Sequence, residues 1–259
     1  MTTQRLWLIG GTQESAELAL AIATEGIPCL ITVTTEAARR LYPASPQCKI
    51  WVGRLDQQRL PAFLQQQQIT AILDASHPFA VEVSRLAIAI AAQQGIPYLR
   101  YERPALDMPN SQSSVLASSF QSLLSSNLLD SQRVLLTVGY RPLPLFKPWQ
   151  EVATLFTRIL PSLTALETAI TAGFTPDRII ALRPPISAAI ERALWQQWQI
   201  SMVVTKASGA AGGEDVKRQV ADELGVKLVA IARPKIIYPQ QTSELAIALQ
   251  FCRNAGARS

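Results

Sequence analysis

The chain alternates short apolar runs, rich in β-branched residues, with longer amphipathic stretches, and this alternation constrains its fold more than any other feature. Ten apolar runs predict strands, five in the first half (LWLIG, PCLITV, KIWVG, TAILDAS, PYLRY) and five in the second (RVLLTVG, TLFTRI, RIIALR, SMVVTK, KLVAIARP). Helical stretches such as TQESAELALAIATEG separate most of these runs, and several end in the Gly expected just past a helix. Strand and helix in alternation predict an α/β protein with parallel sheets covered by helices.

A Ser/Gln-rich polar segment at residues 109–132 divides the ten strands five and five. We therefore expect one domain at residues 1–108, a polar linker at 109–132 and a second domain at 133–259. The halves also share a plan, because AILDASHPFA to YLRYERP and MVVTKASGAAGG to VAIARP both read strand, polar turn, helix, Gly, strand and Arg-Pro. A chain of 259 residues is long enough for two such α/β domains.

Composition excludes several classes of protein. Hydrophobic residues make up 48% of the chain, yet no apolar run approaches the roughly 20 residues that span a bilayer, which predicts a soluble protein. The start MTTQRLWLIGG does not resemble a signal peptide, so the cytoplasm is the expected compartment. The net charge of +5 is dispersed without a basic block, so neither nucleic acid nor a membrane is an expected partner. Cys29, Cys48 and Cys252 form no C-x-x-C pair, and we expect neither a disulfide framework nor a metal site.

Ligands of open parallel sheets bind beyond the carboxyl ends of the strands, so the turns that follow strands are the places to look for function. In the first of these turns, Gly10, Gly11 and Thr12 lie between a strand and a helix, where backbone amides suit a phosphate. The G-x-G-x-x-G fingerprint is incomplete, and Glu14 near the helix start disfavours a deeply placed diphosphate. A nucleotide site and a merely tight turn both remain open for this segment.

The turn DASHPFA carries the only histidine of the chain, His77, directly after a strand. Asp74, Ser76, His77 and Phe79 place a carboxylate, a hydroxyl, an imidazole and an aromatic ring together, which favours contact with a ligand. The alternative is structural, because Asp and Ser cap helices without any chemistry.

The third turn, TKASGAAGG, follows an apolar strand with Lys206, Ser208 and Gly209. Its glycines allow an anion-binding arrangement of amides, and its lysine can meet a carboxylate or a phosphate. A mobile surface loop with one solvated lysine is the alternative.

These turns, in this order, resemble the precorrin-6A reductase family of cobalamin biosynthesis, including its cobalt-precorrin branch. The resemblance spans nearly the whole chain through GGTQE, DASHPFA, GIPYLRYERP, LLTVGYRPLPLF and VVTKASG before AIARP, and the pair DASHPFA and YLRYERP is highly specific. Two segments depart from the family pattern. RPPIS at residues 183–187 stands where the family commonly has Arg-Gly-Pro-Phe-Ser, and KASGAAGG replaces the usual Lys-Asn-Ser-Gly-Gly.

The resemblance implies two Rossmann-like domains that lack the glycine fingerprint, with their last strands exchanged between the sheets. One domain would bind a coenzyme, the other a tetrapyrrole, and DASHPFA would line the cleft between them. The implied reaction moves a hydride from a nicotinamide cofactor to one ring carbon and a proton to its neighbour, which converts precorrin-6A, or its cobalt form, to precorrin-6B. The metal state of the substrate stays open. Transient contacts with neighbouring pathway enzymes are also consistent with this family.

Residue by residue, the resemblance and the strand-end positions nominate His77 and Asp74 as catalytic. The expected cofactor contacts are Gly10, Gly11, Thr12, Thr34, Thr35, Arg39, Ser76 and Phe79. Hydroxyls followed by arginines after the second strand accommodate the 2′-phosphate of NADPH, whereas Glu36 keeps NADH open as the alternative.

The substrate's acetate and propionate groups call for converging cations, because charge-assisted hydrogen bonds to carboxylates are strong. The expected substrate contacts are Arg100, Arg103, Arg183, Lys206, Ser208, Gly209 and Lys217, with Arg233 a weaker candidate. Solvated surface positions are the alternative for each basic residue.

Two other functions remain open at this point. The GGT turn also suits a short-chain-type or nucleotide-sugar oxidoreductase, although no tyrosine is followed by lysine four residues later. A non-catalytic dinucleotide-binding regulator is the alternative from a different class of protein.

Overall fold

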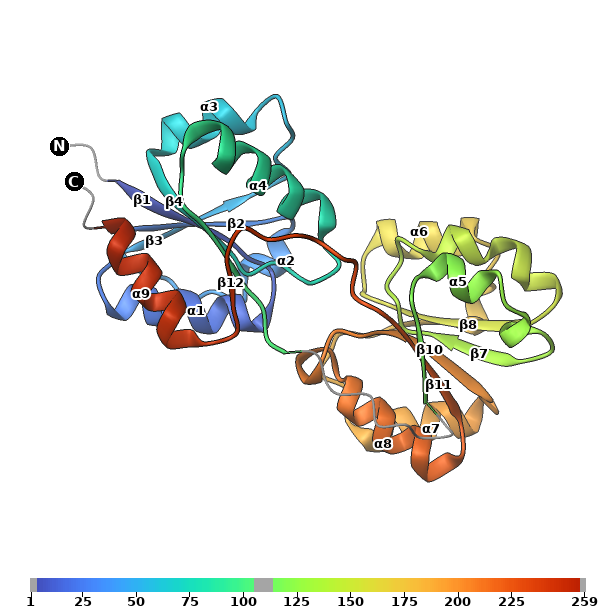
Figure 1. Ribbon diagram of the computed structural model, residues 1–259. Coiled ribbons are helices and arrows are strands. Elements are labelled where there is room, and N and C mark those ends of the chain that lie inside the picture. The colour runs from blue at the N-terminus through green and yellow to red at the C-terminus, as the bar shows by residue number, and fades with distance from the viewer. Residues whose placement is uncertain (1–3, 105–113, 257–259) are drawn as a thin grey trace. The chain divides into compact units, whose positions relative to one another are not determined.

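The computed structural model describes residues 4–104 and 114–256 and consists of two compact units (Figure 1). The first unit comprises Met1–Pro104 together with Pro234–Ser259, and the second comprises Ala105–Arg233. The chain therefore leaves the first unit once, completes the second and returns. Among the described residues, no helix is both long enough and apolar enough to cross a membrane.

Sheet A of the first unit has six parallel strands in the order β12-β5-β4-β1-β2-β3. Its strands are β1 (Arg5–Ile9), β2 (Cys29–Val33), β3 (Cys48–Val52), β4 (Ile69–Asp74), β5 (Tyr98–Tyr101) and β12 (Gln241–Thr242). With β12 counted as the sixth strand, this is the order 3-2-1-4-5-6 of a Rossmann fold.

Helices cover both faces of sheet A (Figure 1). One face packs against α1 (Gln13–Thr24) and α9 (Leu245–Gly256), and the other against α3 (Leu60–Gln67) and α4 (Val81–Gln94). The short helix α2 (Glu36–Arg39) follows β2. The hydrophobic core between sheet A and helices α1 and α9 also contains Cys29 and Cys252, with Cys48 packed against it. All three cysteines are free. The cysteines are scattered in the sequence, but Cys29 and Cys48 are register partners on neighbouring strands.

Sheet B of the second unit repeats this order as β6-β11-β10-β7-β8-β9, again all parallel. Its strands are β6 (Ser114–Ala117), β7 (Arg133–Leu136), β8 (Thr154–Ile159), β9 (Ile179–Ala181), β10 (Met202–Lys206) and β11 (Lys227–Ile231). The helices of this unit are α5 (Phe120–Leu124), α6 (Leu163–Thr171), α7 (Ala188–Gln197) and α8 (Glu214–Leu224), with 3₁₀ segments η1 (Asn127–Leu129), η2 (Leu143–Glu151), η3 (Pro176–Arg178) and η4 (Ala210–Gly212).

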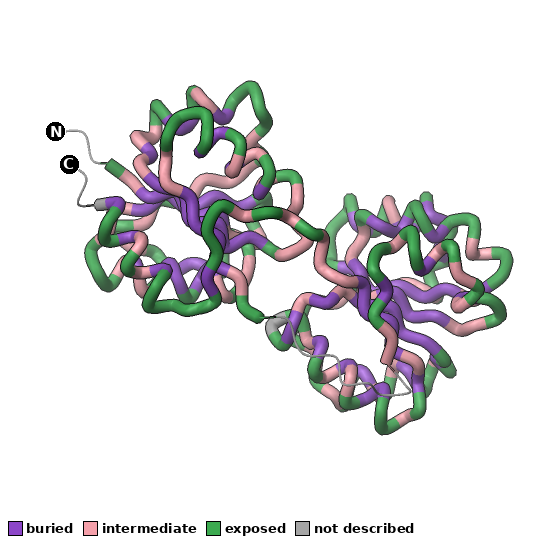
Figure 2. The backbone as a smooth tube through the Cα atoms, viewed as in Figure 1, coloured by how far each residue is buried: buried purple, intermediate pink, exposed green. Residues whose placement is uncertain are grey.

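The inner strands of both sheets are almost continuously buried (Figure 2), which is the pattern of parallel strands covered on both faces, whereas the edge strands β3, β6, β9 and β12 are partly exposed. All ten strands expected from the apolar runs are present, and the α/β class with two parallel Rossmann-like sheets is confirmed. Strand exchange is confirmed as well, since β6 follows β5 in sequence but pairs with β11, and β12 follows β11 but pairs with β5.

The units nevertheless differ from the expected boundaries in two places. Residues 114–129 of the expected polar linker form β6, α5 and η1 of the second unit, while residues 109–113 lie outside the described residues. The serines there act as helix caps, because Ser119 accepts a hydrogen bond from the Ser122 amide and Ser126 accepts one from the Leu128 amide. The expected second domain also ends early, because Pro234–Ser259 belongs to the first unit.

Candidate functional site

The order of sheet A reverses between β1 and β4, and ligands of open α/β sheets bind at such a point. Ile9 at the end of β1 is in register with Asp74 at the end of β4, so the turns after these two strands are neighbours. The amide of Ala75 donates to the Ile9 carbonyl at 3.0 Å, and Thr12 Oγ1 donates to the Ala75 carbonyl at 3.1 Å. Two of the three expected functional turns therefore form one site.

The turn after β1 is held by the side-chain hydroxyls of Tyr42 and Ser15. The Gly11 amide donates to Tyr42 Oη at 2.7 Å and to Ser15 Oγ at 3.2 Å, and the Thr12 amide donates to Ser15 Oγ at 3.0 Å. A Cβ added at Gly10 would lie 2.2 Å from Tyr42 Oη, which explains a glycine at this position. Gly11 has φ +108°, and a Cβ there would meet nothing within 4 Å, so the turn has open space beside it.

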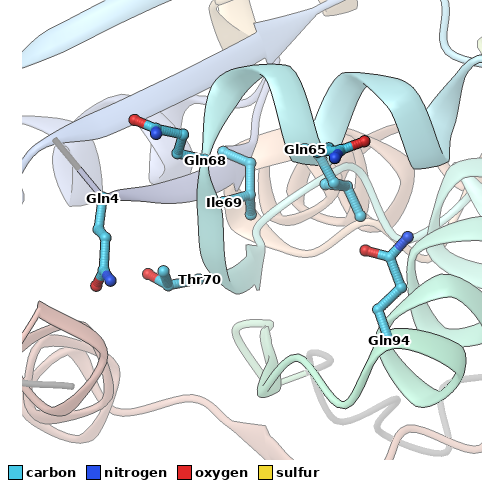
Figure 3. A pocket seen from close by; sticks show the side chains of 7 residues that line it. Gln4, Gln65, Gln68, Ile69, Thr70 and Gln94 are labelled. Atoms are coloured by element: carbon cyan, nitrogen blue, oxygen red, sulfur yellow. The ribbon is translucent and has the colours of Figure 1, made fainter. Parts of the chain in front are cut away.

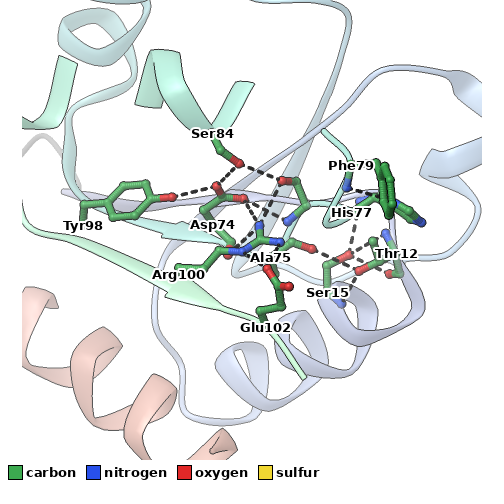
Figure 4. A network of polar contacts seen from close by, with 12 residues as sticks. Thr12, Ser15, Asp74, Ala75, His77, Phe79, Ser84, Tyr98, Arg100 and Glu102 are labelled. Carbon is green, nitrogen blue, oxygen red and sulfur yellow. Dashed lines mark hydrogen bonds and ion pairs between the residues drawn. The ribbon is translucent and has the colours of Figure 1, made fainter. Parts of the chain in front are cut away.

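Behind the second turn lies a buried cluster that we call the Asp74 network, formed by Asp74, Ser76, Ser84, Tyr98, Arg100 and Glu102 (Figure 4). Asp74 is fully buried. Its Oδ1 accepts from the Ser76 amide at 3.0 Å and from Arg100 Nη1 at 2.8 Å. Its Oδ2 accepts from Ser84 Oγ at 2.6 Å and Tyr98 Oη at 2.8 Å. This carboxylate is therefore enclosed by protein donors.

Arg100 is also fully buried, between two carboxylates. Its Nη1 additionally donates to Ser76 Oγ at 3.1 Å, while its Nε and Nη2 donate to Glu102 Oε2 at 2.9 and 2.7 Å. Burial by itself would lower the pKa of Arg100, but the charges of Asp74 and Glu102 outweigh it and raise that pKa. The side chain nominated as a substrate contact therefore lies charged inside the unit, with its donors directed at the protein.

Tyr98 completes the network from the first position of β5. Burial, followed by the charge of Asp74, raises the pKa of Tyr98 far above its usual range. Its hydroxyl therefore stays protonated and serves as a donor to Asp74.

His77 is exposed at the turn, where its backbone and its ring both make local hydrogen bonds. The Ala80 amide donates to the His77 carbonyl at 2.7 Å, and the Phe79 amide donates to His77 Nδ1 at 3.2 Å. The rings of His77 and Phe79 lie 5.9 Å apart, tilted by 48°. Because Nδ1 accepts a hydrogen bond, the arrangement stabilises the neutral tautomer whose proton is on Nε2.

The third part of this edge follows β2. Thr34, Thr35 and Arg39 are exposed there, and Thr35 caps α2 by accepting from the Ala38 amide at 3.1 Å. Arg39 lies 3.7 Å from Glu36 in an exposed i,i+3 ion pair, a type that contributes little stability. These hydroxyls and this cation therefore lie at the same edge of sheet A as the GGT and DASHPFA turns.

Sheet B reverses its order between β7 and β10. Two basic residues, Lys206 and Arg141, follow or end these strands. The Thr137 amide donates to the Val204 carbonyl at 2.8 Å, so the segment leading to Arg141 starts beside the end of β10. Burial, and then repulsion by the exposed Arg141, lowers the pKa of Lys206 to about 8. Arg233 Nε donates to the Ala207 carbonyl at 2.9 Å, which braces the turn after β10.

The glycine-rich turn after β10 is closed by charged groups at the start of α8. The Gly209 amide donates to Glu214 Oε2 at 2.8 Å. Lys217 Nζ donates to the carbonyls of Gly212 and Gly213 at 2.9 and 3.0 Å. Burial, and then repulsion by Arg158, lowers the pKa of Lys217 to about 8. The nominated Lys217 is thus 3% exposed, with its ammonium directed at the turn's own carbonyls.

Of the remaining nominated residues, Arg103 and Arg183 lie apart from both reversal points, whereas Ser208 lies at that of sheet B. Arg103 follows β5 and forms an exposed ion pair with Glu17 at 2.5 Å. Arg183 is exposed after β9, which is the edge strand of sheet B. Ser208 lies beside Lys206 in the turn after β10 and is half-buried.

Sequence reasoning missed the side chains that support these turns from a distance. Tyr42, Ser15, Ser84 and Tyr98 were not nominated, and neither was Arg141. Only Arg141 had a local signal, since it follows the apolar run RVLLTVG in a strand-end position. Ser15 and Ser84 reach their turns from helices, Tyr98 from the start of a strand and Tyr42 from the loop after α2, which only the folded chain shows.

A separate hollow of about 360 Å³ lies at the opposite, amino-terminal edge of sheet A (Figure 3). Four glutamines, at positions 4, 65, 68 and 94, line it together with Leu64, Ile69 and Thr70. Because it faces the starts of β1 and β4, it is not part of the candidate site.

Comparison with known proteins gives a consistent picture. A family profile described as "Precorrin-6x reductase CbiJ/CobK" matches residues 5–253. A cobalt-precorrin-6A reductase of Synechocystis sp. is 50% identical over 96% of this chain and 95% of its own length, and one of Priestia megaterium is 35% identical over 89% and 91%. A solved structure titled "CobK precorrin-6A reductase" has a TM-score of 0.80 at 22% identity and covers 98% of both chains.

Proposed function

Because the chain belongs to the precorrin-6x reductase CbiJ/CobK family, it is a cobalt-precorrin-6A reductase-type enzyme of cobalamin biosynthesis, and we propose that its reductant is NADPH. Membership rests on the match over residues 5–253 and on the relative at 50% identity. It decides against the short-chain, nucleotide-sugar and regulator alternatives that the sequence left open.

The cofactor proposal rests on the edge of sheet A. The open space beside Gly11, the amino end of α1, and Thr34, Thr35 and Arg39 after β2 fit a dinucleotide with a 2′-phosphate. The amides of Gly11 and Thr12, expected as phosphate donors, already donate to the hydroxyls of Tyr42 and Ser15. The pyrophosphate would therefore lie in the open space beside a turn that is held in shape before it binds. Bound NADPH would supply the hydride, and Phe79 would contact it from the DASHPFA turn. Ser76, which the sequence also nominated as a cofactor contact, is buried, and its amide and hydroxyl are used by Asp74 and Arg100.

For His77 we propose a role as a neutral hydrogen-bond donor to a substrate carboxylate. Its Nδ1 accepts from the Phe79 amide, so protonation would convert that acceptor to a donor and break the bond. Supplying a proton from Nε2 of a neutral imidazole is unfavourable, whereas donating a hydrogen bond from it is not. The turn geometry therefore favours the carboxylate role over proton supply.

We propose that substrate carboxylates also meet Lys206 and Arg141 at the reversal point of sheet B, together with Ser208 and the Gly209 turn. Repulsion by Arg141 contributes to the lowered pKa of Lys206, and a carboxylate near both cations would relieve that repulsion. Arg183 of the second unit and Arg103 of the first remain candidate substrate contacts. We propose instead that Arg100 and Lys217 stabilise turns, because both side chains are buried and donate their hydrogen bonds to acceptors of the protein.

The function is tested with purified protein, NADPH or NADH, and precorrin-6A in metal-free and cobalt forms, while the absorption of the tetrapyrrole is followed. We expect reduction of the cobalt form, since the relatives at 50% and 35% identity carry that name, and a preference for NADPH. Arg39→Gln should weaken NADPH binding about tenfold and leave NADH unchanged, with Arg59→Gln, also exposed, as control. A preference for NADH would instead point to Glu36 as the ribose ligand.

A further inference from the structure

The Asp74 network is too enclosed to act on a substrate directly. Asp74 and Arg100 are both fully buried, and every carboxylate oxygen of Asp74 accepts from two donors of the protein. A fully buried carboxylate in such a set of contacts has no route to the reacting atoms. Asp74 was nominated as catalytic from its place in DASHPFA, so its role in this fold needs another explanation.

The network is directed at the turn that carries His77. Asp74 holds the Ser76 amide, and Arg100 holds both Asp74 and Ser76 Oγ, so the residue before His77 is fixed through its backbone and its side chain (Figure 4). Ser84 of α4 and Tyr98 of β5 fix Asp74 from its other oxygen. Three elements, β4, β5 and α4, thereby converge on one turn.

The segment that returns from the second unit closes this network. The Arg100 amide donates to the Gln240 carbonyl at 2.9 Å, and Gln241 of β12 is in register with Arg100. The ring of Tyr238 lies over the Arg100 guanidinium, with 5.3 Å from Cζ to the ring centroid. Tyr238 therefore contacts the network through the Arg100 guanidinium.

We propose that Asp74, Arg100 and Tyr98 are positioning residues of the reductase reaction, that they act through His77, and that Tyr238 of the returning segment is part of the same device. The inference rests on the proposed role of His77. It gives the exchanged strand a function: the turn that carries His77 takes its working geometry only when β12 and Tyr238 have folded back onto β5.

Tyr98→Phe is the most informative variant, because it removes one buried hydroxyl and nothing exposed. Asp74 keeps three of its four donors, so the protein should fold with a thermal midpoint within a few degrees of the wild type. We expect kcat/KM to fall about tenfold in the wild-type background and less than twofold in a His77→Ala background, because residues that act as one unit are not additive. Ser84→Ala provides a second variant with the same expected pattern if Tyr98→Phe does not fold.

The returning segment is tested in the same assay. Tyr238→Leu, which removes the ring over Arg100, should lower kcat/KM about tenfold, and Tyr238→Phe, which keeps the ring, should retain activity within about threefold. Ile237→Ala is the matched control, because Ile237 is the preceding residue and is 95% exposed. It should behave as the wild type.

A readout without turnover comes from the single histidine. In an untagged protein, the His77 ring protons give one set of nuclear magnetic resonance signals. These signals should shift in Tyr98→Phe and Tyr238→Leu but not in Ile237→Ala.

Full activity of both Tyr98→Phe and Ser84→Ala, or a tenfold loss that persists in the His77→Ala background, would overturn the positioning proposal. A wild-type protein that does not reduce the macrocycle with NADPH, or a fully active His77→Ala, would instead contradict the proposed function. The two failures are therefore distinguishable.

Discussion

At the scale of single residues, the site depends on which atoms still face outward after the turns have formed. His77 is exposed, but its Nδ1 already accepts from the Phe79 amide, and Lys206 is charged beside another cation. Asp74, Arg100 and Lys217 are charged too, yet their polar atoms form hydrogen bonds with other groups of the protein. Charge and position in a motif nominate all five equally, whereas their hydrogen bonds separate the proposed ligand contacts, His77 and Lys206, from the three residues that hold turns.

For His77 we expect glutamine to substitute better than asparagine. The Gln Nε2 amide reaches about as far as His Nε2, whereas the Asn amide reaches only to the position of Nδ1. His77→Gln should keep kcat/KM within about threefold, and His77→Asn and His77→Ala should lose at least tenfold, as measured by steady-state kinetics with thermal midpoints as control. Equal losses in all three variants would contradict the donor role.

Substrate binding should weaken as pH rises through the pKa of Lys206. With a pKa lowered to about 8, Lys206 is charged at pH 7 and loses its charge between about pH 7 and pH 9. We expect the dissociation constant of the tetrapyrrole, measured by fluorescence quenching at constant ionic strength, to rise about tenfold over this interval. Lys206→Met should bind weakly at both pH values, and Lys235→Met, which alters an exposed lysine, should follow the wild type. A wild-type constant that does not change with pH would exclude Lys206 from the substrate site.

At the scale of elements, each strand-end turn is held by side chains that come from elsewhere in its own unit. Tyr42 lies beyond α2 but reaches the turn after β1, and Tyr98 at the start of β5 reaches the turn after β4. Lys217 and Glu214 of α8 close the turn after β10. The glycines in these turns leave room for those supports as much as for a ligand.

The packing at Gly10 predicts a coupled pair. Gly10→Ala places a Cβ 2.2 Å from Tyr42 Oη and should lower the stability of the protein by about 1–3 kcal/mol, the usual cost of overpacking. Tyr42→Phe removes that oxygen, so the double variant should be more stable than the sum of the single changes predicts. Denaturant unfolding of the four proteins measures the coupling, and strict additivity would mean that Gly10 is not limited by Tyr42.

At the scale of the whole molecule, strand exchange makes one unit continuous in sequence and the other discontinuous. The second unit is one continuous stretch, Ala105–Arg233, whereas the first needs Pro234–Ser259 to complete it. That returning segment supplies β12 at the edge of sheet A and the buried residues Ala248, Cys252 and Ala255 of its core. Without α9, one face of sheet A would keep only α1 as its cover.

Fragments should show this difference. Residues 105–233 expressed alone should fold cooperatively, as followed by circular dichroism during thermal unfolding. Residues 1–104 alone should not fold cooperatively, because β5 lacks its neighbour β12 and the core lacks α9. Joining residues 1–104 to 234–259 through a short Gly/Ser linker should restore a cooperative transition. A cooperative transition in residues 1–104 alone would show that the returning segment is dispensable for this unit.

Much of this protein was determined by local sequence. Apolar runs alternating with amphipathic stretches predicted ten strands and the parallel α/β class. The strand-end positions of Gly10 to Thr12, Asp74 to Phe79 and Lys206 to Gly209 also follow from the sequence, while their role as ligand contacts stays a prediction. These features could be predicted because hydrophobic period and turn chemistry act over a few residues. Strand exchange came from the resemblance to a family rather than from any pattern in the chain.

Tertiary structure alone decided the rest. The strands β6 and β12 are too short or too polar to predict, since SVLA lies among serines and β12 is only Gln241–Thr242, and they are strands because a neighbouring edge offers its backbone for pairing. The burial of Arg100 and the reach of Tyr98, Tyr42 and Tyr238 depend on contacts between residues 24 to 138 positions apart in the chain. A charged side chain has the same local sequence whether it meets a ligand or a buried carboxylate, so only the packing around it separates a binding residue from a support.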